Sequence, residues 1–414
     1  MLPTIKRPKK NIYLDYAATT PLDPMVKKAM APFFSKKFGN PSSLYEKGRE
    51  AKEAIEQSRK TIANLIGARP AEIIFTAGGT ESVNLAIFGV ARNYSPRHHL
   101  LSSKIEHHCV INSFKALAGE GYKTSFVGVG RQGQIDMDQL KSSIKPETIL
   151  ISVIYANNEI GTVEPIAEIG KWLKSLNAQR ILKKLPKIIF HTDACQAAGY
   201  LDLNADALGV DLMSINGSKV SGPKQSGFLY ARSGLNLKPL IYGGGQERGL
   251  RSGTENVPAI VGFAKALELA QKDRNRENKR LVGLRDYLIK KIKTNTPNVL
   301  LNGADDSSLK VSNRSSNATN KLPNITNLTF KGVEGESLMI YLDSYGISVS
   351  TASACSTGNL EPSHVLLAIG RSPAEAKSSI RISLGKQTEK KEIDYLLKVL
   401  PPLVNQLRQV KNQN

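Results

Sequence analysis

The chain has 414 residues, of which 40% are hydrophobic and 22% charged, and its formal net charge is +21. This length is too great for one small core and predicts two or three domains of a soluble globular protein. No apolar stretch approaches the roughly 18 residues of a membrane span, and the basic N-terminus lacks the apolar core of a signal peptide. We therefore expect no membrane segment and a cytoplasmic location.

The charge and the cysteines exclude two further classes. The basic residues are dispersed and have no interleaved aromatic residues, which favours solvated faces and a general basic bias over direct nucleic-acid binding. The three cysteines, Cys109, Cys195 and Cys355, are too few for a disulfide framework and include no Cys-x-x-Cys pair. Each is expected to be a reduced thiol, judged by its surroundings.

Helix and strand signals alternate through the first 265 residues, which predicts an α/β domain with a largely parallel sheet. An amphipathic helix is expected from Arg49 to Ile66, followed by a short strand over Glu72–Thr76 and a helix from Glu81 to Ala91. The run Thr148–Tyr155 is typical of a fully buried strand.

The pattern changes after about residue 265, where a smaller α+β domain is expected. A long charged helix should span Ala264–Lys293, and the Ser- and Asn-rich residues 303–322 should form a surface loop. Strands are predicted over Ile325–Phe330 and Ile347–Ser350, with a helix over Gly335–Ser344 between them. The predicted domains are residues 12–265, the large one, and residues 266–414, the small one, with residues 1–11 packing near the latter.

Two apolar runs in the large domain stop at polar clusters, one at Asp193 and the other at Lys219. Buried parallel strands deliver such side chains to a site at the C-terminal edge of a sheet. A buried carboxylate can keep a pyridine nitrogen protonated, and a lysine can form an imine with an aldehyde. The pair therefore suggests pyridoxal phosphate (PLP) as cofactor.

A glycine turn lies between the strand at Glu72–Thr76 and the next helix, with Gly79 and Thr80 at its end. Glycines let the backbone approach a ligand, and the free N–H groups of a helix start attract a phosphate, which PLP carries. The formal G-x-G-x-x-G match over residues 128–133 is rejected as a dinucleotide site. Its helix begins only at Asp136 or later, and no acidic residue follows at the ribose distance.

Three other residues are candidates for a functional role. His107 lacks a partner at metal-binding spacing, so a histidine stacked on a flat cofactor, or simply packed, is favoured over a metal ligand, and we expect no metal site. Cys355 lies among small residues, as reactive cysteines in mobile loops do, whereas Cys109 and Cys195 are expected to be small fillers. Arg381, inside an apolar strand, needs a carboxylate partner, either a substrate's or one in a structural ion pair.

With these residues in hand, the chain resembles the cysteine desulfurases of the NifS/IscS type, which are fold type I PLP enzymes of the class V aminotransferase group. The resemblance runs from Tyr13–Pro21 to Ser379–Gly385. It includes the blocks Phe38–Pro41, Tyr155–Gly161 and Gly243–Thr254. It implies an α/β PLP-dependent transferase fold with a mostly parallel sheet flanked by helices, a homodimer, and the removal of sulfur from L-cysteine to give L-alanine.

The resemblance also implies a role for each matching residue. It makes Lys219, Cys355 and His107 catalytic: Lys219 forms the imine, Cys355 receives the sulfur, and His107 stacks on the ring. Arg381, together with Asn158, would bind the substrate carboxylate. The remaining contacts are expected from Asp193 to the ring nitrogen, from Gln196 and Asn158 to the ring oxygen side, and from Gly79, Thr80, Asn216, Ser218 and the other subunit's Thr254 to the phosphate.

The chain departs from the common family pattern next to the lysine. Many members carry Ser-Gly-His-Lys where this chain has Asn216-Gly-Ser218-Lys219. An amide and a hydroxyl can still hydrogen-bond a phosphate, so PLP binding is expected to survive. The alternatives are a small-substrate aminotransferase or selenocysteine lyase on the same scaffold, and a non-catalytic adaptor. The expected acceptor of the sulfur is a protein such as an iron–sulfur scaffold, or one acting in tRNA thiolation.

Overall fold

The alternating signals of the first 265 residues form a seven-stranded sheet in the computed structural model, which describes residues 11–305, 320–351 and 361–411. The strand order is β2-β8-β7-β6-β5-β3-β4, and only the pairs that involve β8 are antiparallel. The strands are β2 (Ile73–Thr76), β3 (His99–Ser103), β4 (Lys123–Val127), β5 (Thr148–Ser152), β6 (Ile189–Asp193), β7 (Leu212–Asn216) and β8 (Gly227–Ala231). The predicted α/β class with a mostly parallel sheet is confirmed.

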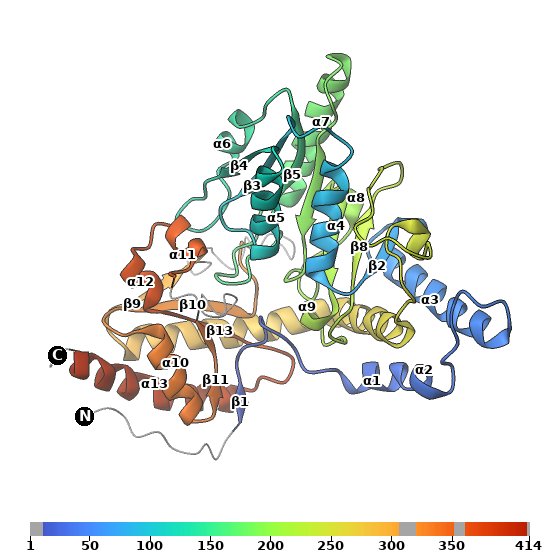
Figure 1. Cartoon of the computed structure of the whole chain (residues 1–414). Helices are drawn as coiled ribbons and strands as arrows, with labels where there is room; N and C mark the ends of the chain where they lie inside the picture. The colour runs from blue at the N-terminus through green and yellow to red at the C-terminus, as the bar shows by residue number, and fades with distance from the viewer. Residues whose placement is uncertain (1–10, 306–319, 352–360, 412–414) are drawn as a thin grey trace.

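Helices cover both faces of this sheet, as Figure 1 shows. Successive strand residues point to opposite faces, so Leu229 joins the core beneath α4 and α5, while Phe228 and Tyr230 join the core beneath α3, α7 and α9. The helices before α9 are α1 (Pro24–Met30), α2 (Pro32–Ser35), α3 (Glu46–Leu65), α4 (Gly79–Ala91), α5 (His108–Gly119), α6 (Met137–Ser142), α7 (Ile166–Leu182) and α8 (Ala205–Leu208).

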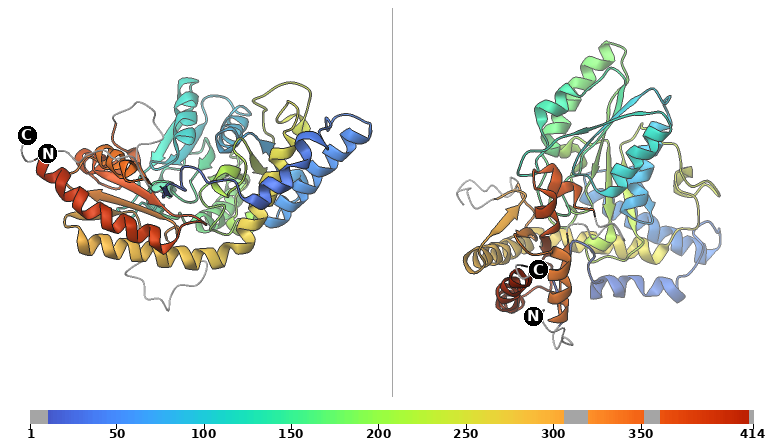
Figure 2. Two further views of the ribbon diagram at one scale, coloured as in Figure 1. Left: turned by 90° about the horizontal axis from the view of Figure 1, so that it is seen from below. Right: turned by 60° about the vertical axis from the view of Figure 1, so that its left-hand side comes forward.

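A long helix, α9 (Val257–Asn295), connects this layer to a second core. Its first half packs against the large sheet through Phe263 and Leu267, and its second half contributes Leu281 and Leu288 to the other core. The predicted boundary at residues 265 and 266 therefore falls inside one continuous helix. Figures 1 and 2 show α9 running beneath both parts, with α13 beside its second half.

The second core is built around a four-stranded antiparallel sheet of order β12-β13-β10-β9. A separate parallel pair joins β1 near the N-terminus to β11. These strands are β1 (Ile12–Tyr13), β9 (Val299–Asn302), β10 (Ile325–Phe330), β11 (Ile347–Ser348), β12 (Ser350–Thr351) and β13 (Ser379–Ser383). The helices are α10 (Gly335–Ser344), α11 (His364–Ala368), α12 (Pro373–Lys377) and α13 (Lys390–Lys411).

Most predicted elements are present with shifted ends. The strand Ile325–Phe330 and the helix Gly335–Ser344 have the predicted bounds. The strand predicted over Thr148–Tyr155 ends at Ser152, and the long helix begins at Val257, because the Asn256 side chain accepts a hydrogen bond from the Ala259 N–H and caps it. The predicted strand Ile347–Ser350 is two short strands that belong to different sheets.

The loop predicted over residues 303–322 lies mostly outside the described residues. Helix α6 begins at Met137, after the Asp136 cap, so the rejection of a dinucleotide site at residues 128–133 is supported. Within the described ranges, no helix is both long and apolar enough to cross a membrane.

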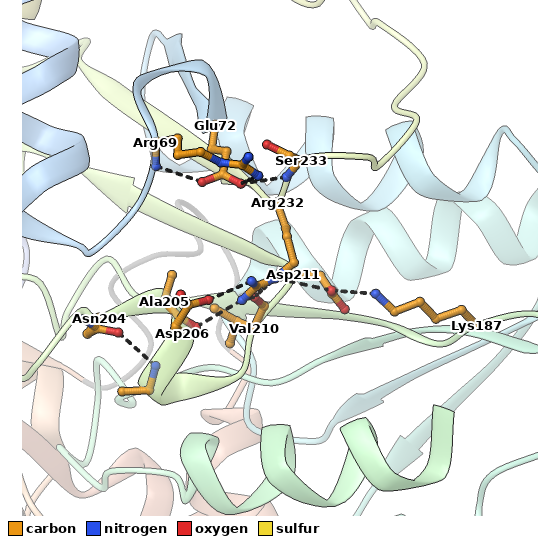
Figure 3. Close-up of polar contacts among 11 residues, drawn as sticks. Arg69, Glu72, Lys187, Asn204, Ala205, Asp206, Val210, Asp211, Arg232 and Ser233 are labelled. Atoms are coloured by element: carbon orange, nitrogen blue, oxygen red, sulfur yellow. Dashed lines mark hydrogen bonds and ion pairs between the residues drawn. The ribbon is translucent and has the colours of Figure 1, made fainter. Parts of the chain in front are cut away.

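Polar contacts fix the outer edge of the large sheet, where β2 starts and β8 ends (Figure 3). The Glu72 carboxylate accepts hydrogen bonds from the Arg69 and Ser233 N–H groups, both at 2.8 Å. Burial raises the pKa of Glu72, but these bonds outweigh it and lower the pKa to about 2. β2 and β8 pair from Ile73 to Thr76, and the glycine turn begins at the end of β2 opposite to this anchor.

Candidate active site

The two strand ends singled out in the sequence lie side by side. Asp193 is the last residue of β6, and the neighbouring parallel strand β7 ends at Asn216, from which a single 3-10 turn leads to Lys219. Because parallel strands end at the same edge of a sheet, the carboxylate and the lysine reach one site. The predicted position at the C-terminal sheet edge is confirmed.

A cavity of about 230 Å³ lies at this edge. Its wall brings together residues that are far apart in the sequence, from the start of the chain to β13. The predicted site residues that line it are Gly79, Thr80, His107, Asn158, Asp193, Gln196, Asn216, Lys219 and Arg381. Two sheets and their connecting segments thus contribute to a single concave site, as small-molecule sites commonly require.

Lys219 contacts a segment near the N-terminus that the sequence did not single out. Its Nζ donates to the Ala17 carbonyl at 2.8 Å and to the Ala18 carbonyl at 2.6 Å. Gln196 Nε2 donates to the same Ala17 carbonyl at 2.7 Å. The amino group is therefore held at the cavity wall by carbonyl oxygens, which accept hydrogen bonds and carry no formal charge.

Asp193 is buried, and its Oδ1 accepts a hydrogen bond from the Cys195 N–H at 3.0 Å. Two residues earlier in β6, His191 is enclosed between Ser152 Oγ on β5 (2.8 Å) and Ser214 Oγ on β7 (2.9 Å). Burial lowers the pKa of His191 to about 4, although Asp193 acts in the opposite direction. The imidazole next to Asp193 in the strand is thus neutral, which leaves the carboxylate charge for a ligand.

His107 caps the N-terminus of α5, with its Nδ1 3.2 Å from the Cys109 nitrogen and 3.0 Å from Cys109 Sγ. Burial lowers its pKa; Asp193 opposes this shift, whereas Lys219 and His108 add to it. The residue before it, Glu106, is completely buried, and burial raises its pKa to about 8 despite hydrogen bonds from Ser103 and the Ile154 N–H. The raised pKa keeps Glu106 protonated near neutral pH, and the lowered pKa of His107 favours its neutral ring.

Arg381 has a carboxylate partner within the chain. Its Nη2 lies 2.8 Å from Asp15 Oδ1, and its Nη1 donates to the Asn158 carbonyl at 2.8 Å. The Arg381 side chain is only 3% exposed, and its Nε has no hydrogen-bond partner among the described residues. The structural ion pair considered from the sequence is present, and the guanidinium still lines the cavity.

A second, more open cavity of about 680 Å³ lies at the N-terminus of α4. It is lined by Gly79, Thr80, Asn216, Ser218 and Lys224, among others. Asn216 Oδ1 accepts from both the N–H and the hydroxyl of Ser218, at 3.0 and 3.1 Å. The first N–H groups of a helix lack intrahelical acceptors and favour anions, so this end of α4 suits a phosphate.

Gly79 is required by close packing at this point. A Cβ there would lie 2.6 Å from Cys195 Sγ and 3.3 Å from the Asn216 Cβ. Thr254, which was expected to act in the other subunit, lines a separate cavity with Gln225 and Arg251 and not the cavity of Lys219. Its predicted action across a dimer interface stays a prediction.

The thiols divide into two groups. Cys109 and Cys195, expected to be fillers, both line the cavity of Lys219, and burial together with nearby Asp193 raises the pKa of each thiol. They stay protonated and are poor nucleophiles. Cys355, the predicted sulfur acceptor, lies outside the described residues.

Comparison with known proteins decides the family. Residues 12–396 match the family model described as aminotransferase class-V. The chain belongs to the class-V aminotransferase family. Within it, it is 47% identical to a protein named cysteine desulfurase IscS from Dictyoglomus turgidum, over 97% of this chain and 96% of that one. It is 43% identical to the cysteine desulfurase IscS of Methanosarcina thermophila, over 96% and 93% of the two chains.

Solved structures agree with this class-V assignment. A NifS-like protein superposes with a TM-score of 0.85 at 34% identity, covering 96% of this chain and all of the other. The DndA protein of Streptomyces lividans gives a TM-score of 0.72 at 32% identity, covering 90% and 99%. The expected resemblance to NifS/IscS-type enzymes and the fold of a PLP-dependent transferase are thus confirmed.

Enzymes of this class-V type use PLP, and the residues present fit that group. The cavity offers a buried carboxylate at Asp193 and an amine at Lys219, and it adjoins the open N-terminus of α4, where a Cβ at Gly79 would clash. These are the acid, amine and phosphate partners that the cofactor needs. Sequence reasoning missed Asp15 and the Ala17 and Ala18 carbonyls as parts of the site, although the block Tyr13–Pro21 that contains them was among the matching segments.

Proposed function

We propose that this chain is a PLP-dependent cysteine desulfurase that removes sulfur from L-cysteine, releases L-alanine and keeps the sulfur as a persulfide on Cys355. The observation that carries the proposal is the single cavity lined by Asp193, Lys219, His107 and Arg381. The names of the relatives, cysteine desulfurase IscS at 41–47% identity, support the same reaction.

When bound, the cofactor supplies an electron sink for the charge that develops at the substrate α-carbon. Asp193 would keep the ring nitrogen protonated, because a buried carboxylate favours the cationic partner. Lys219 would hold the cofactor through its amine and would also be the base for the substrate α-proton. Gln196 and Asn158 are proposed to lie at the ring oxygen, and His107 over the ring face.

Arg381 would bind the substrate carboxylate with Asn158 next to it, in addition to its ion pair with Asp15. The guanidinium has five N–H donors, of which the hydrogen bonds to Asp15 and the Asn158 carbonyl use two. A carboxylate held by charge-assisted hydrogen bonds fixes the orientation of the α-carbon towards Lys219.

The sulfur step balances without an external oxidant. The Cys355 thiolate attacks the substrate sulfur, so that an S–S bond forms as the C–S bond breaks. The electron pair of the broken bond stays with the carbon skeleton, which takes up a proton and leaves as alanine. The outer sulfur atom of the persulfide then passes to an acceptor protein, which we propose to be an iron–sulfur scaffold or a tRNA-thiolation protein.

The phosphate would be held by Gly79, Thr80, Asn216 and Ser218, with Thr254 of a second subunit completing the cradle. A homodimer is supported by exposed apolar side chains on and near α1, α2 and the segment before Thr254: Met25, Phe34, Phe38, Leu44, Tyr45 and Tyr242. Large apolar side chains that are exposed in the single chain favour burial in an interface. We further propose two domains, residues 12–265 and 266–414, with residues 1–11 near the second, and a cytoplasmic location.

The test is a quantitative assay of alanine and sulfide from L-cysteine with a thiol reductant present. Lys219→Ala should lose the visible cofactor absorbance and all activity. Cys355→Ala should keep the absorbance and lose sulfide release, and Cys195→Ala serves as the matched thiol control with activity retained. Undiminished sulfide release from the Cys355 variant would refute its role, and an unchanged spectrum in the Lys219 variant would remove the PLP assignment.

A further inference from the structure

The hydrogen bonds at the start of α5 determine which nitrogen of His107 carries a proton. The Cys109 backbone N–H points at His107 Nδ1 from 3.2 Å. A backbone N–H can only donate, so Nδ1 must accept. In the neutral ring the proton is therefore on Nε2, on the side of the ring away from the helix terminus.

The Cys109 thiol is a second donor to the same nitrogen. Its Sγ lies 3.0 Å from His107 Nδ1. Burial raises the pKa of the thiol, and the carboxyl groups of Asp193 and Glu106 raise it further, so the sulfur keeps its hydrogen near neutral pH. Protonation of Nδ1 would place an N–H against the Cys109 backbone N–H and would turn the thiol from a donor into a weak acceptor, which disfavours the imidazolium.

Resting on the proposed function, we propose that Cys109 is a positioning residue that fixes His107 as a neutral ring whose only proton is on Nε2. Such a ring can donate a hydrogen bond from Nε2 to a group in the cavity, while Nδ1 is occupied as an acceptor and is harder to protonate. Cys109 was expected only to fill space, but its thiol also contacts His107 Nδ1. A side chain of equal size without a hydrogen-bond donor would remove that partner from Nδ1.

Other charged groups around His107 do not replace this contact. Asp193, at the end of β6, favours the charged ring, whereas Lys219 in the turn after β7 and His108 in α5 disfavour it. Only the Cys109 donors touch Nδ1 in the part of the chain that the structure describes. Removing the thiol should therefore change the protonation equilibrium of His107 at one identified atom, Nδ1.

The experiment is a ¹³C and ¹⁵N NMR titration of the histidine rings in the full-length, PLP-loaded protein between pH 5 and 9. The chain has six histidines, so a His107→Asn variant identifies the signal of interest. We expect Cys109→Ala to raise the His107 pKa by about 0.5–1 pH unit, the size expected for one weak hydrogen bond. Cys109→Ser should keep the wild-type pKa because its hydroxyl still donates.

The matched control is Cys195→Ala, which removes the other thiol of the cavity. Cys195 Sγ lies 3.7 Å from the Ser214 carbonyl, whereas the hydrogen-bond partners of His107 Nδ1 among the described residues belong to Cys109. Its removal should leave the His107 titration unchanged. An unchanged titration in Cys109→Ala, or an equal shift in Cys195→Ala, would overturn the inference.

A parallel pH profile of kcat/KM separates this inference from the proposed function. In an active enzyme, Cys109→Ala should move the acidic limb to higher pH by the same interval as the NMR titration, and Cys109→Ser should not. If the wild-type protein releases no alanine from L-cysteine, the proposed function fails, while the NMR comparison still decides the role of Cys109. If it is active and the ring titrates identically in all variants, only the inference fails.

Discussion

Substitution of Glu247 by glutamine tests how the segment that precedes Thr254 is held in place. The Glu247 carboxylate accepts two hydrogen bonds from Arg59, at 2.7 and 2.8 Å, and a third from the Phe75 N–H at 2.8 Å. The side chains of Arg59 and Glu247 are 5% and 2% exposed. Glu247 and Arg248 both have positive φ values, 48° and 59°, a conformation that disfavours residues with a Cβ. The carboxylate thus stabilises a strained turn next to β2 and its glycine turn.

The magnitude follows from burial. Glutamine keeps the shape of Glu247 but removes its charge, which leaves the buried guanidinium of Arg59 with the partly exposed Glu56, 3.2 Å from its Nε, as its remaining anionic partner. Breaking a buried pair in this way costs about 3–5 kcal/mol. With an unfolding entropy of about 2.1 cal/mol/K per residue, a chain of this length should melt about 3–6 °C lower.

Calorimetry of the PLP-loaded protein measures this shift, and the bound cofactor per subunit is read from the visible absorbance. The matched control is Asp394→Asn, which breaks the exposed pair with Lys390 at 2.8 Å and should leave the melting temperature unchanged. The double variant Arg59→Met/Glu247→Gln should recover more than half of the loss, because no buried guanidinium is then left without its buried carboxylate partner. A Glu247→Gln protein that melts with the wild type, or a double variant worse than both single ones, would refute the reasoning.

Three further outcomes are expected. Arg381→Lys should raise the KM for L-cysteine about 10–100-fold with a smaller change in kcat, as measured by steady-state kinetics. The reason is that an ammonium cannot hold the Asn158 carbonyl and a carboxylate in the same planar geometry. An unchanged KM would contradict this. Glu106 keeps its proton in the folded state up to a pKa of about 8, whereas the unfolded group loses it near 4.5, so this group's contribution to stability falls as pH rises between these values. Glu106→Gln should therefore gain stability relative to wild type from pH 5 to 8.5 in urea unfolding, and parallel curves would argue against a buried neutral acid. Gly79→Ala should lower the amount of bound PLP, measured by absorbance, because the new Cβ would clash with Cys195 Sγ. Adding Cys195→Ala should restore part of the PLP binding. If it does not, the clash with Cys195 is not the cause of the loss.

Much of the architecture was predictable because it rests on local patterns. The apolar runs that end at Asp193 and Lys219 identify buried parallel strands, and parallel strands share one C-terminal edge, so their meeting followed from the sheet alone. The helix Gly335–Ser344 and the strand Ile325–Phe330 were found with their observed bounds because their periodicities are unambiguous.

What the sequence missed depends on contacts between distant segments. Arg381 and Asp15 are 366 residues apart, and nothing local predicts that the guanidinium of β13 has a carboxylate from the N-terminal segment as its partner. The Ala17 and Ala18 carbonyls that hold Lys219 are backbone groups, which no residue type signals. The role of Cys109 likewise requires the direction of one N–H towards a histidine ring, which a pattern of residue types does not contain.

The most direct test of the central claim is intact-protein mass spectrometry after a single turnover with L-cysteine, without reductant. The account predicts a mass increase of one sulfur atom per subunit, located at Cys355 by peptide mapping, together with one equivalent of alanine. Cys355→Ala should still bind the cofactor but show neither the added sulfur nor the alanine. Alanine formation at the wild-type rate in that variant, or added sulfur on Cys109 or Cys195 in the wild type, would contradict it.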